Sequence, residues 1–307
     1  MAKYLIFRTD RIGDFITSQA VTSSLSEFSK KNQIDIVASK YNSKYISKFK
    51  YIKNIYIFDK TGSKILDFLN LIFILKNKKY DYLIVLDGKR RSFFSGIFIN
   101  SRIKICFLKE FYPKLLILLF YNKYLKNSET NTQFKNFQIL LNYLDVKLPL
   151  SINYYRKYKF VKNKYNLKKP YLHLHLDEKW FKNYYFHDYD YMNLNSKKIY
   201  LFIKDLIKKF KTNIVITQGF KNVDVLDKFK FQYFKNQKSN QIKFKDKSII
   251  LIEDASFRDL ENIVKNCKIL ICCEGAISHV SHSLNKKTIS LVQKDRIITT
   301  NFWIGHM

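Results

Sequence analysis

The chain has 307 residues, of which 47% are hydrophobic, so it is long enough to bury a core in each of two domains. This composition excludes a mainly disordered protein. Lysine and arginine number 56 against 25 acidic residues, and the formal charge of +31 favours anionic partners such as nucleic acid, anionic lipid or a phosphorylated small molecule. A low-GC coding bias accounts for part of this excess, because the lysines are scattered among Asn, Ile, Tyr and Phe.

The first half of the chain alternates short β-rich runs with helical stretches, which is typical of β-α-β units. We expect strands at 3–8, 33–38, 55–58, 81–87 and 102–107, and helices at 15–30, 42–49, 64–77, 91–100 and within 113–143. The connections are short, as in a doubly wound parallel sheet. A first α/β domain is therefore predicted over residues 1–150.

Residues 151–169 are rich in Lys, Tyr and Asn without a clear period, and they are predicted to be a linker. The alternation then restarts, which predicts a second doubly wound domain over 170–307. We expect strands at 171–176, 213–217, 248–252, 268–273 and 287–292, and helices at 196–210, 256–266 and 276–284. The last segment, from Lys294, has no evident closing helix.

Cysteine usage and the N-terminus indicate a cytoplasmic protein. No paired C-x-x-C spacing is present, so neither a disulfide framework nor a zinc site is indicated. The N-terminus has no signal-peptide apolar region, and the longest apolar run, 115–121, is too short to span a bilayer. A membrane contact would then be peripheral. The cysteines are Cys106, Cys267, Cys272 and Cys273.

The stretch from Lys3 to Leu25 is the most informative motif, because an apolar strand runs into a polar loop ending in Gly13 and Asp14 before a helix begins. Ligand crevices in open α/β sheets lie at the carboxyl ends of strands, so a carboxylate there can reach a substrate. Asp14 is therefore a candidate catalytic residue. The alternative is that Asp10 and Asp14 only cap the helix.

The seven glycines form neither a G-x-G-x-x-G nor a P-loop motif, so bound phosphates would need helix N-termini and cationic side chains. One candidate is Lys179, in the loop after the strand that carries His175; the alternative is an ordinary solvated lysine.

The segment 270–284 is the stronger candidate for a phosphate site. A strand is followed at once by Glu274, Gly275 and Ala276, and then by a helix that carries His279. Small residues let backbone N–H groups approach a ligand, and the helix dipole attracts anions. Glu274 is suited to bind ribose hydroxyls or to cap the helix, and His279 to bind phosphate or to lie in the core.

Two metal motifs are discounted. Residues 188–190 form a D-x-D sequence in a weakly patterned aromatic stretch, where the motif is common by chance. His173 and His175 alternate along a strand and share one face, but no third ligand is placed near them. Neither a metal nor a cofactor is expected.

Taken in order, these motifs resemble glycosyltransferase family 9, the ADP-heptose lipopolysaccharide heptosyltransferases. The opening is similar to the family's R-x-D-x-I-G-D signature, and the late segment 272–292 is similar to its D-[ST]-G-x-x-H segment. Glu274 and Gly275 depart from that pattern, standing where the family has Asp and Ser or Thr. The signature positions are Arg8, Asp10, Ile12, Gly13 and Asp14.

The resemblance implies a GT-B fold, with two facing Rossmann-like domains that bind acceptor and donor on either side of a cleft. It implies that Asp14 is the catalytic base and that the other matching residues bind the donor, namely Lys179, Glu274, Gly275, Ala276 and His279. Arg8, Asp10, Gly13 and His175 are expected to support these loops.

The predicted reaction is an inverting, metal-independent sugar transfer from a nucleotide-sugar, with ADP-heptose as the first candidate, to a glycolipid or glycan acceptor. The protein would be cytoplasmic, with peripheral contact to the anionic inner face of the bacterial inner membrane. Two alternatives stay open: a catalytically degenerate protein that binds sugar nucleotide or glycolipid, and a basic nucleic-acid-binding protein. No recognisable nucleic-acid module is present, so no nucleic-acid partner is expected.

Overall fold

The computed structural model shows an α/β protein of two compact units, as predicted. Unit 1 comprises Met1–Tyr158 together with Asn301–His306, and unit 2 comprises Lys159–Thr300. Residues 301–306, which the predicted second domain 170–307 includes, are grouped with unit 1 in this division. Most of the predicted linker, 151–163, and the D-x-D motif at 188–190 lie outside the described residues. The structure describes residues 1–59, 61–108, 112–126, 131–147, 164–181, 194–219, 221–234, 240–292 and 297–305.

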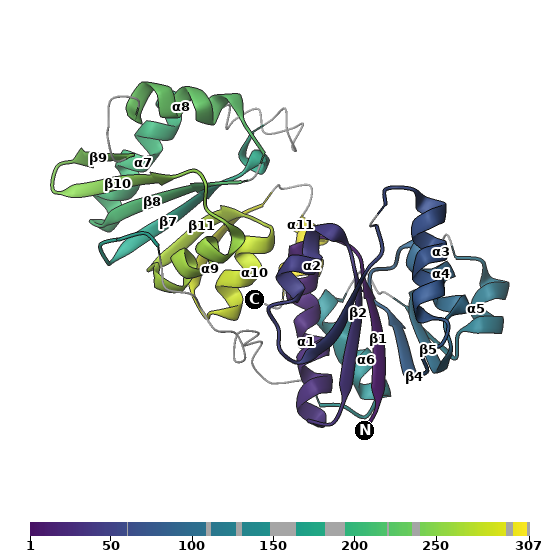
Figure 1. Ribbon diagram of the computed structural model, residues 1–307. Coiled ribbons are helices and arrows are strands. Elements are labelled where there is room, and N and C mark those ends of the chain that lie inside the picture. Colours follow the sequence, from purple (N-terminus) through teal and green to yellow (C-terminus); the bar gives the residue numbers. More distant parts are fainter. Residues whose placement is uncertain are drawn as a thin grey trace. The chain divides into compact units, whose positions relative to one another are not determined.

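Unit 1 is built on a six-stranded sheet in the order β3-β2-β1-β4-β5-β6, in which every neighbouring pair is parallel (Figure 1). Its strands are β1 (Lys3–Arg8), β2 (Gln33–Ala38), β3 (Ile52–Ile57), β4 (Tyr80–Val85), β5 (Ser101–Leu108) and β6 (Lys123–Lys126). Its helices are α1 (Ile12–Phe28), α2 (Lys40–Ile46), α3 (Lys64–Leu75), α4 (Arg90–Phe98), α5 (Lys114–Phe120) and α6 (Gln133–Tyr143).

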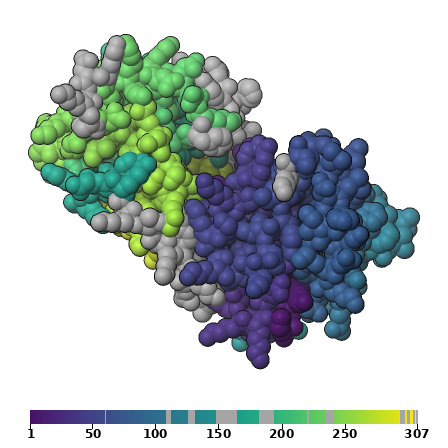
Figure 2. Space-filling model, viewed as in Figure 1, coloured from purple at the N-terminus to yellow at the C-terminus, as the bar shows by residue number. Residues whose placement is uncertain are grey.

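The helices α3, α4 and α5 cover one face of this sheet, where their buried side chains share a core with strand residues such as Leu5 and Leu83. Leu71 and Leu75 of α3, Phe93 of α4 and Ile117 of α5 enter that core. In Figure 2 the residues of these three helices fall within the blue-to-teal surface of unit 1. Helix α1 makes contacts with α2 and α6.

Unit 2 repeats the plan with the strand order β12-β11-β7-β8-β10-β9, in which only the edge pair of β9 and β10 is antiparallel. Its strands are β7 (Tyr171–Leu176), β8 (Asn213–Gln218), β9 (Gln241–Phe244), β10 (Lys247–Ile252), β11 (Ile269–Cys273) and β12 (Lys287–Leu291). Its helices are the 3-10 turn η1 (Glu178–Trp180), α7 (Ser196–Phe210), α8 (Asp224–Phe234), α9 (Phe257–Asn266) and α10 (Ala276–Ser283), and α11 (Ile297–Ile304) crosses from unit 2 to unit 1.

Several elements differ from those expected. Helix α1 begins at Ile12, so Gly13 and Asp14 lie in its first turn rather than in the preceding loop. The expectations missed the short edge strands β6 and β9 and helix α8, and they gave the C-terminus no helix where α11 is found. No helix among the described residues is long and apolar enough to cross a bilayer. All four cysteines are free and buried.

Candidate functional site

The two loops that flank the centre of the unit 1 sheet form the first candidate site. The chain runs from β1 outward through β2 and β3, then returns to β4 and continues to β5 and β6 on the other side. The sheet therefore has its topological switch point between β1 and β4, which pair through Phe7 and Val85 near their carboxyl ends. In open α/β sheets, ligands bind in the crevice outside such a switch point.

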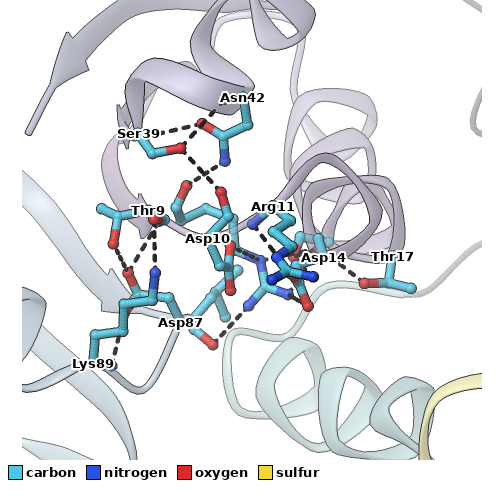
Figure 3. A network of polar contacts seen from close by, with 12 residues as sticks. Thr9, Asp10, Arg11, Asp14, Thr17, Ser39, Asn42, Asp87 and Lys89 are labelled. Atoms are coloured by element: carbon cyan, nitrogen blue, oxygen red, sulfur yellow. Dashed lines mark hydrogen bonds and ion pairs between the residues drawn. The ribbon is translucent and has the colours of Figure 1, made fainter. Parts of the chain in front are cut away.

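Arg8, the last residue of β1, is buried and is the centre of a polar network at this point. Figure 3 shows the loops of this network, with Asp10, Asp14 and Asp87 labelled. Its guanidinium donates to the Asp14 carbonyl from Nε (3.0 Å) and Nη2 (2.8 Å), and from Nη1 to the Leu86 carbonyl (3.0 Å). Nε also lies 3.3 Å from Asp10 Oδ1, and Nη2 lies 3.7 Å from Asp14 Oδ1. One buried cation thus joins the ends of β1 and β4 to the first turn of α1.

Asp14 is held by the start of helix α1. Its Oδ2 accepts a hydrogen bond from the Arg11 N–H (3.1 Å), as expected for the third residue of a capped helix. Its carbonyl also accepts from the hydroxyls of Thr17 and Ser18, both at 2.8 Å. Asp14 therefore does cap helix α1, as the alternative interpretation expected. This capping contact does not bury the carboxylate, because the Asp14 side chain remains 26% exposed.

Asp10 has a different environment from Asp14. Burial raises the pKa of Asp10 from 3.8 to about 7; the Arg8 guanidinium opposes this change, and the neighbouring carboxylates of Asp14 and Asp87 add to it. The backbone around Asp10 is fixed by the β2–α2 loop, since the Ser39 hydroxyl donates to the Asp10 carbonyl (3.0 Å). The two aspartates of the motif thus differ in their electrostatic surroundings.

The loop after β4 contributes residues that the sequence analysis did not single out. Asp87 accepts hydrogen bonds from the Thr9 N–H (3.0 Å), the Thr9 hydroxyl (2.7 Å) and the Ser92 hydroxyl (2.7 Å). Lys89 Nζ and Arg91 Nη2 both donate to the Thr9 carbonyl, at 2.8 and 3.0 Å. The signal was present, because the polar run 87–91 follows a buried strand as the run 9–14 does.

The second candidate site lies at the corresponding place in unit 2. The chain runs from β7 through β8 to β10 on one side, then crosses back to β11 and β12, so the switch point lies between β7 and β11. Lys179 follows β7, and Glu274 and Gly275 follow β11. The structure thus brings together, across this switch point, residues that are 95 positions apart in the sequence.

Lys179 contacts both the carbonyl and the carboxylate of Glu274. Its Nζ donates to the Glu274 carbonyl and lies 3.5 Å from Glu274 Oε2, and its side chain is only 13% exposed. The backbone is set by Asp177, whose Oδ1 accepts from the Lys179 N–H (3.1 Å) at the start of η1. Lys179 is therefore a positioned ammonium at the strand ends, and the alternative of an ordinary solvated lysine does not describe it.

Helix α10 begins beside this pair. A Cβ atom at Gly275 would lie 3.1 Å from Lys179 Nζ, so a side chain there would crowd the ammonium. The Gly275 N–H donates to the Ser278 hydroxyl (3.2 Å), which leaves Ala276 and Ile277 as the predicted anion-binding donors of the first turn. His279 is buried, with Nε2 3.9 Å from Glu274 Oε1, so it lies beside the turn.

His173 and His175 share one partner on the neighbouring strand. His173 Nε2 and His175 Nδ1 lie 2.7 and 2.8 Å from the Thr217 hydroxyl, which can donate to one ring and accept from the other. Burial lowers the pKa of His175 to about 4 and that of His173 well below 6.5, which favours the neutral form of both rings near pH 7. The His175 carbonyl accepts from Trp180 Nε1 (2.9 Å), which ties β7 to the turn that carries Lys179. Among the described residues, no group of three His, Cys, Asp or Glu side chains is placed to hold a metal.

Searches by sequence found no matching protein-family model and no matching curated protein. Comparison of structures did find matches. A glycosyltransferase of family 9 from Veillonella parvula has a TM-score of 0.69 at 15% identity, over 94% of this chain and 80% of that one. The E. coli ADP-heptose lipopolysaccharide heptosyltransferase II has a TM-score of 0.67 at 15% identity, over 99% and 88%.

The structure of E. coli heptosyltransferase WaaC with ADP-2-deoxy-2-fluoro heptose matches with a TM-score of 0.65 at 13% identity, over 94% of this chain and 88% of that one. The fold is also shared by UDP-GlcNAc 2-epimerases, with a TM-score of 0.56 for the protein from Methanocaldococcus jannaschii. Since fold alone does not determine function, these matches establish the architecture: the chain has the two-domain α/β fold of the heptosyltransferases, as the resemblance implied.

Proposed function

We propose that this protein is an inverting, metal-independent glycosyltransferase of family 9. It would transfer a sugar, with heptose as the first candidate, from a nucleoside-diphosphate donor to a lipopolysaccharide, lipooligosaccharide or related glycan acceptor. One observation carries the proposal: each unit places its motif residues at its own topological switch point, with Asp14 in unit 1 and Lys179 with Glu274 in unit 2. The similarity to heptosyltransferases, one of them with an ADP-heptose analogue, supports the choice of donor.

In the proposed reaction Asp14 acts as general base. It takes the proton of an acceptor hydroxyl while that oxygen forms a bond to the anomeric carbon of the donor. The bond from the anomeric carbon to the diphosphate oxygen breaks, and its electron pair leaves with the nucleoside diphosphate. Attack from the face opposite the leaving group inverts the anomeric configuration.

Lys179 and the first turn of α10 would stabilise the leaving diphosphate. Negative charge develops on the diphosphate as the bond breaks, and a fixed ammonium beside a helix N-terminus is suited to offset it. Lys179 is already oriented by Glu274, so it would need little reorganisation when the donor binds. The acceptor would be a phosphorylated glycolipid at the inner face of the bacterial inner membrane, which suits the charge of +31.

The substitution Asp14→Asn tests the proposed base. Asn keeps an oxygen that can accept the Arg11 N–H, so the helix cap survives while the base is removed. We expect the transfer rate to fall by about 10²- to 10⁴-fold, the usual contribution of general base catalysis. The measurement is release of ADP from ADP-heptose in the presence of heptose-deficient lipopolysaccharide, with calorimetry to show that ADP still binds.

Asp259→Asn is the matched control. Asp259 occupies the third position of helix α9 and accepts the Ser256 N–H (3.0 Å), the same capping contact that Asp14 makes in α1. The Asp259→Asn substitution should leave the transfer rate unchanged. Equal rates for wild type and Asp14→Asn would reduce Asp14 to a helix cap. If the wild-type protein binds ADP-heptose but transfers no sugar, the alternative of a catalytically degenerate binding protein is favoured. The departures from the family pattern at Glu274 and Gly275 are the reason for considering that alternative.

A further inference from the structure

Two helices of unit 1 carry apolar side chains on their outward faces. Helix α3 buries Leu71 and Leu75, and α5 buries Ile117, yet the remaining side chains of both helices are also mostly apolar. An exposed helix normally presents polar residues to water. The outward side chains, which we call the α3–α5 apolar surface, are Ile65, Leu66, Leu69, Phe73, Ile74, Leu115, Leu118, Leu119 and Phe120, each more than 40% exposed.

The two helices belong to one continuous layer. Helix α4 lies between them in the chain and shares their face of the sheet, and Phe98 at its end is 61% exposed and in ring contact with Phe68 of α3. Phe93 of α4 stacks on Tyr112 and Tyr121, which flank α5 at its two ends. In Figure 1 the labels α3, α4 and α5 lie on the same part of unit 1, and α3 and α4 are in contact. Exposed apolar patches of this extent mark interaction sites.

Charge identifies the kind of partner. Exposed lysines follow or precede the apolar residues: Lys64 begins α3, Lys76 and Lys78 follow it, and Lys114 begins α5. Asp67 is the only acidic residue of 64–79, 90–98 and 112–126, and its buried carboxylate accepts from the Thr61 N–H (2.7 Å) and hydroxyl (2.8 Å). Within these three described segments, the surface therefore combines exposed apolar side chains with ammonium groups and carries no exposed carboxylate.

We propose that the α3–α5 apolar surface docks on an anionic phospholipid bilayer. The apolar side chains would enter the boundary between headgroups and acyl chains, while the lysine stems extend to the lipid phosphates. Pairing with a second copy of this chain would instead bring identical lysines together on a protein of charge +31. The inference assigns the peripheral membrane contact of the proposed function to one surface of unit 1, and the binding of vesicles needs neither donor nor turnover.

The test is co-sedimentation of the full chain with vesicles of phosphatidylcholine, with and without phosphatidylglycerol, at low and high salt. We expect binding only to the anionic vesicles, weakened by salt. The double variant Leu69→Gln, Phe73→Gln should reduce the partition coefficient by about tenfold or more, because two apolar insertions are lost. Both side chains are more than half exposed, so the fold should tolerate the change.

The matched control is Leu201→Gln, Phe231→Gln, which changes two exposed apolar residues on α7 and α8 of unit 2 and should leave vesicle binding unchanged. Unaltered binding by the α3 variant would overturn the proposal. So would sedimentation velocity showing a wild-type dimer that the α3 variant dissociates, because the surface would then be a contact between copies. Calorimetry with ADP on the same variants separates this outcome from a failure of the proposed function.

Discussion

The substitution Asp10→Asn should remove a pH dependence that the buried carboxyl imposes on the stability of unit 1. Burial raises the pKa of Asp10 to about 7 in the folded protein, against 3.8 for an ordinary aspartate. Between these two values the folded state binds more protons than the unfolded state, so the free energy of unfolding decreases as the pH rises. Asn resembles the neutral acid in shape and has no proton to lose, so the variant lacks this decrease.

The size of the effect follows from the two pKa values. One pKa unit corresponds to 1.36 kcal/mol, so the change from 3.8 to about 7 corresponds to about 4 kcal/mol. The stability of Asp10→Asn relative to wild type should therefore rise by this amount between pH 4 and pH 8. Most other titrations cancel in this difference, since both proteins share them.

A fluorescence assay can follow unit 1 alone. The chain has two tryptophans; Trp180 lies in unit 2, and Trp303 belongs to the segment 301–306 that makes its contacts in unit 1. In a Trp180→Phe background, urea unfolding monitored by Trp303 reports the stability of unit 1 with and without Asp10→Asn. A difference that stays constant from pH 4 to pH 8 would refute the raised pKa of Asp10.

Two further predictions concern Lys179, which lies beside Glu274, and Gly96, which lies against Tyr121. Lys179→Met should weaken ADP binding by about 10- to 100-fold, because a charge-assisted contact to the diphosphate is lost; calorimetry measures this, and Lys208→Met on the outside of α7 should bind as wild type does. Gly96→Ala should destabilise unit 1 by about 1–3 kcal/mol although alanine favours helices. Its Cβ would clash with the buried Tyr121 hydroxyl, which donates to the Phe93 carbonyl (2.7 Å). Tyr121→Phe in the same background should recover part of the loss in thermal denaturation, and a stabilised Gly96→Ala would contradict the packing.

The strands of both sheets could be predicted because continuous apolar runs are typical of parallel strands that are buried on both faces. The run "YLHLHL" corresponds to β7, with every residue buried, and Lys3–Arg8 corresponds to β1. The edge strands β6 and β9 gave no such signal. Each is only four residues long and contains no continuous apolar run, so periodicity does not distinguish them from loops.

The start of α1 was misplaced for a local reason. Arg11 is an uncommon N-cap residue with no side-chain cap, so the usual Ser, Thr, Asp or Asn signal is missing and only the carboxylate at the third position marks the start.

The sequence identified candidate site residues only within single loops. It could not identify residues that join the site because their strands are neighbours in the sheet. Asp14 and Lys179 were found because each follows a strand in a recognisable motif. Asp87 and Lys89 were missed because nothing in the sequence says that β4 lies beside β1 rather than beside β3. The pairing of Thr217 with two histidines is likewise a contact between neighbouring strands, 42 and 44 residues apart in the sequence, which no local pattern reveals.

Helix α11 has a consequence for how the chain reaches its folded state. Because residues 301–306 make their contacts in unit 1, that unit is not a single stretch of sequence, and its contacts are completed only after all of unit 2 has been synthesised. The chain is synthesised from its N-terminus, so unit 1 would acquire its last segment only when unit 2 has emerged and can already fold. A fragment that ends before residue 301 would leave the neighbours of that segment in unit 1, including Thr132, in contact with water.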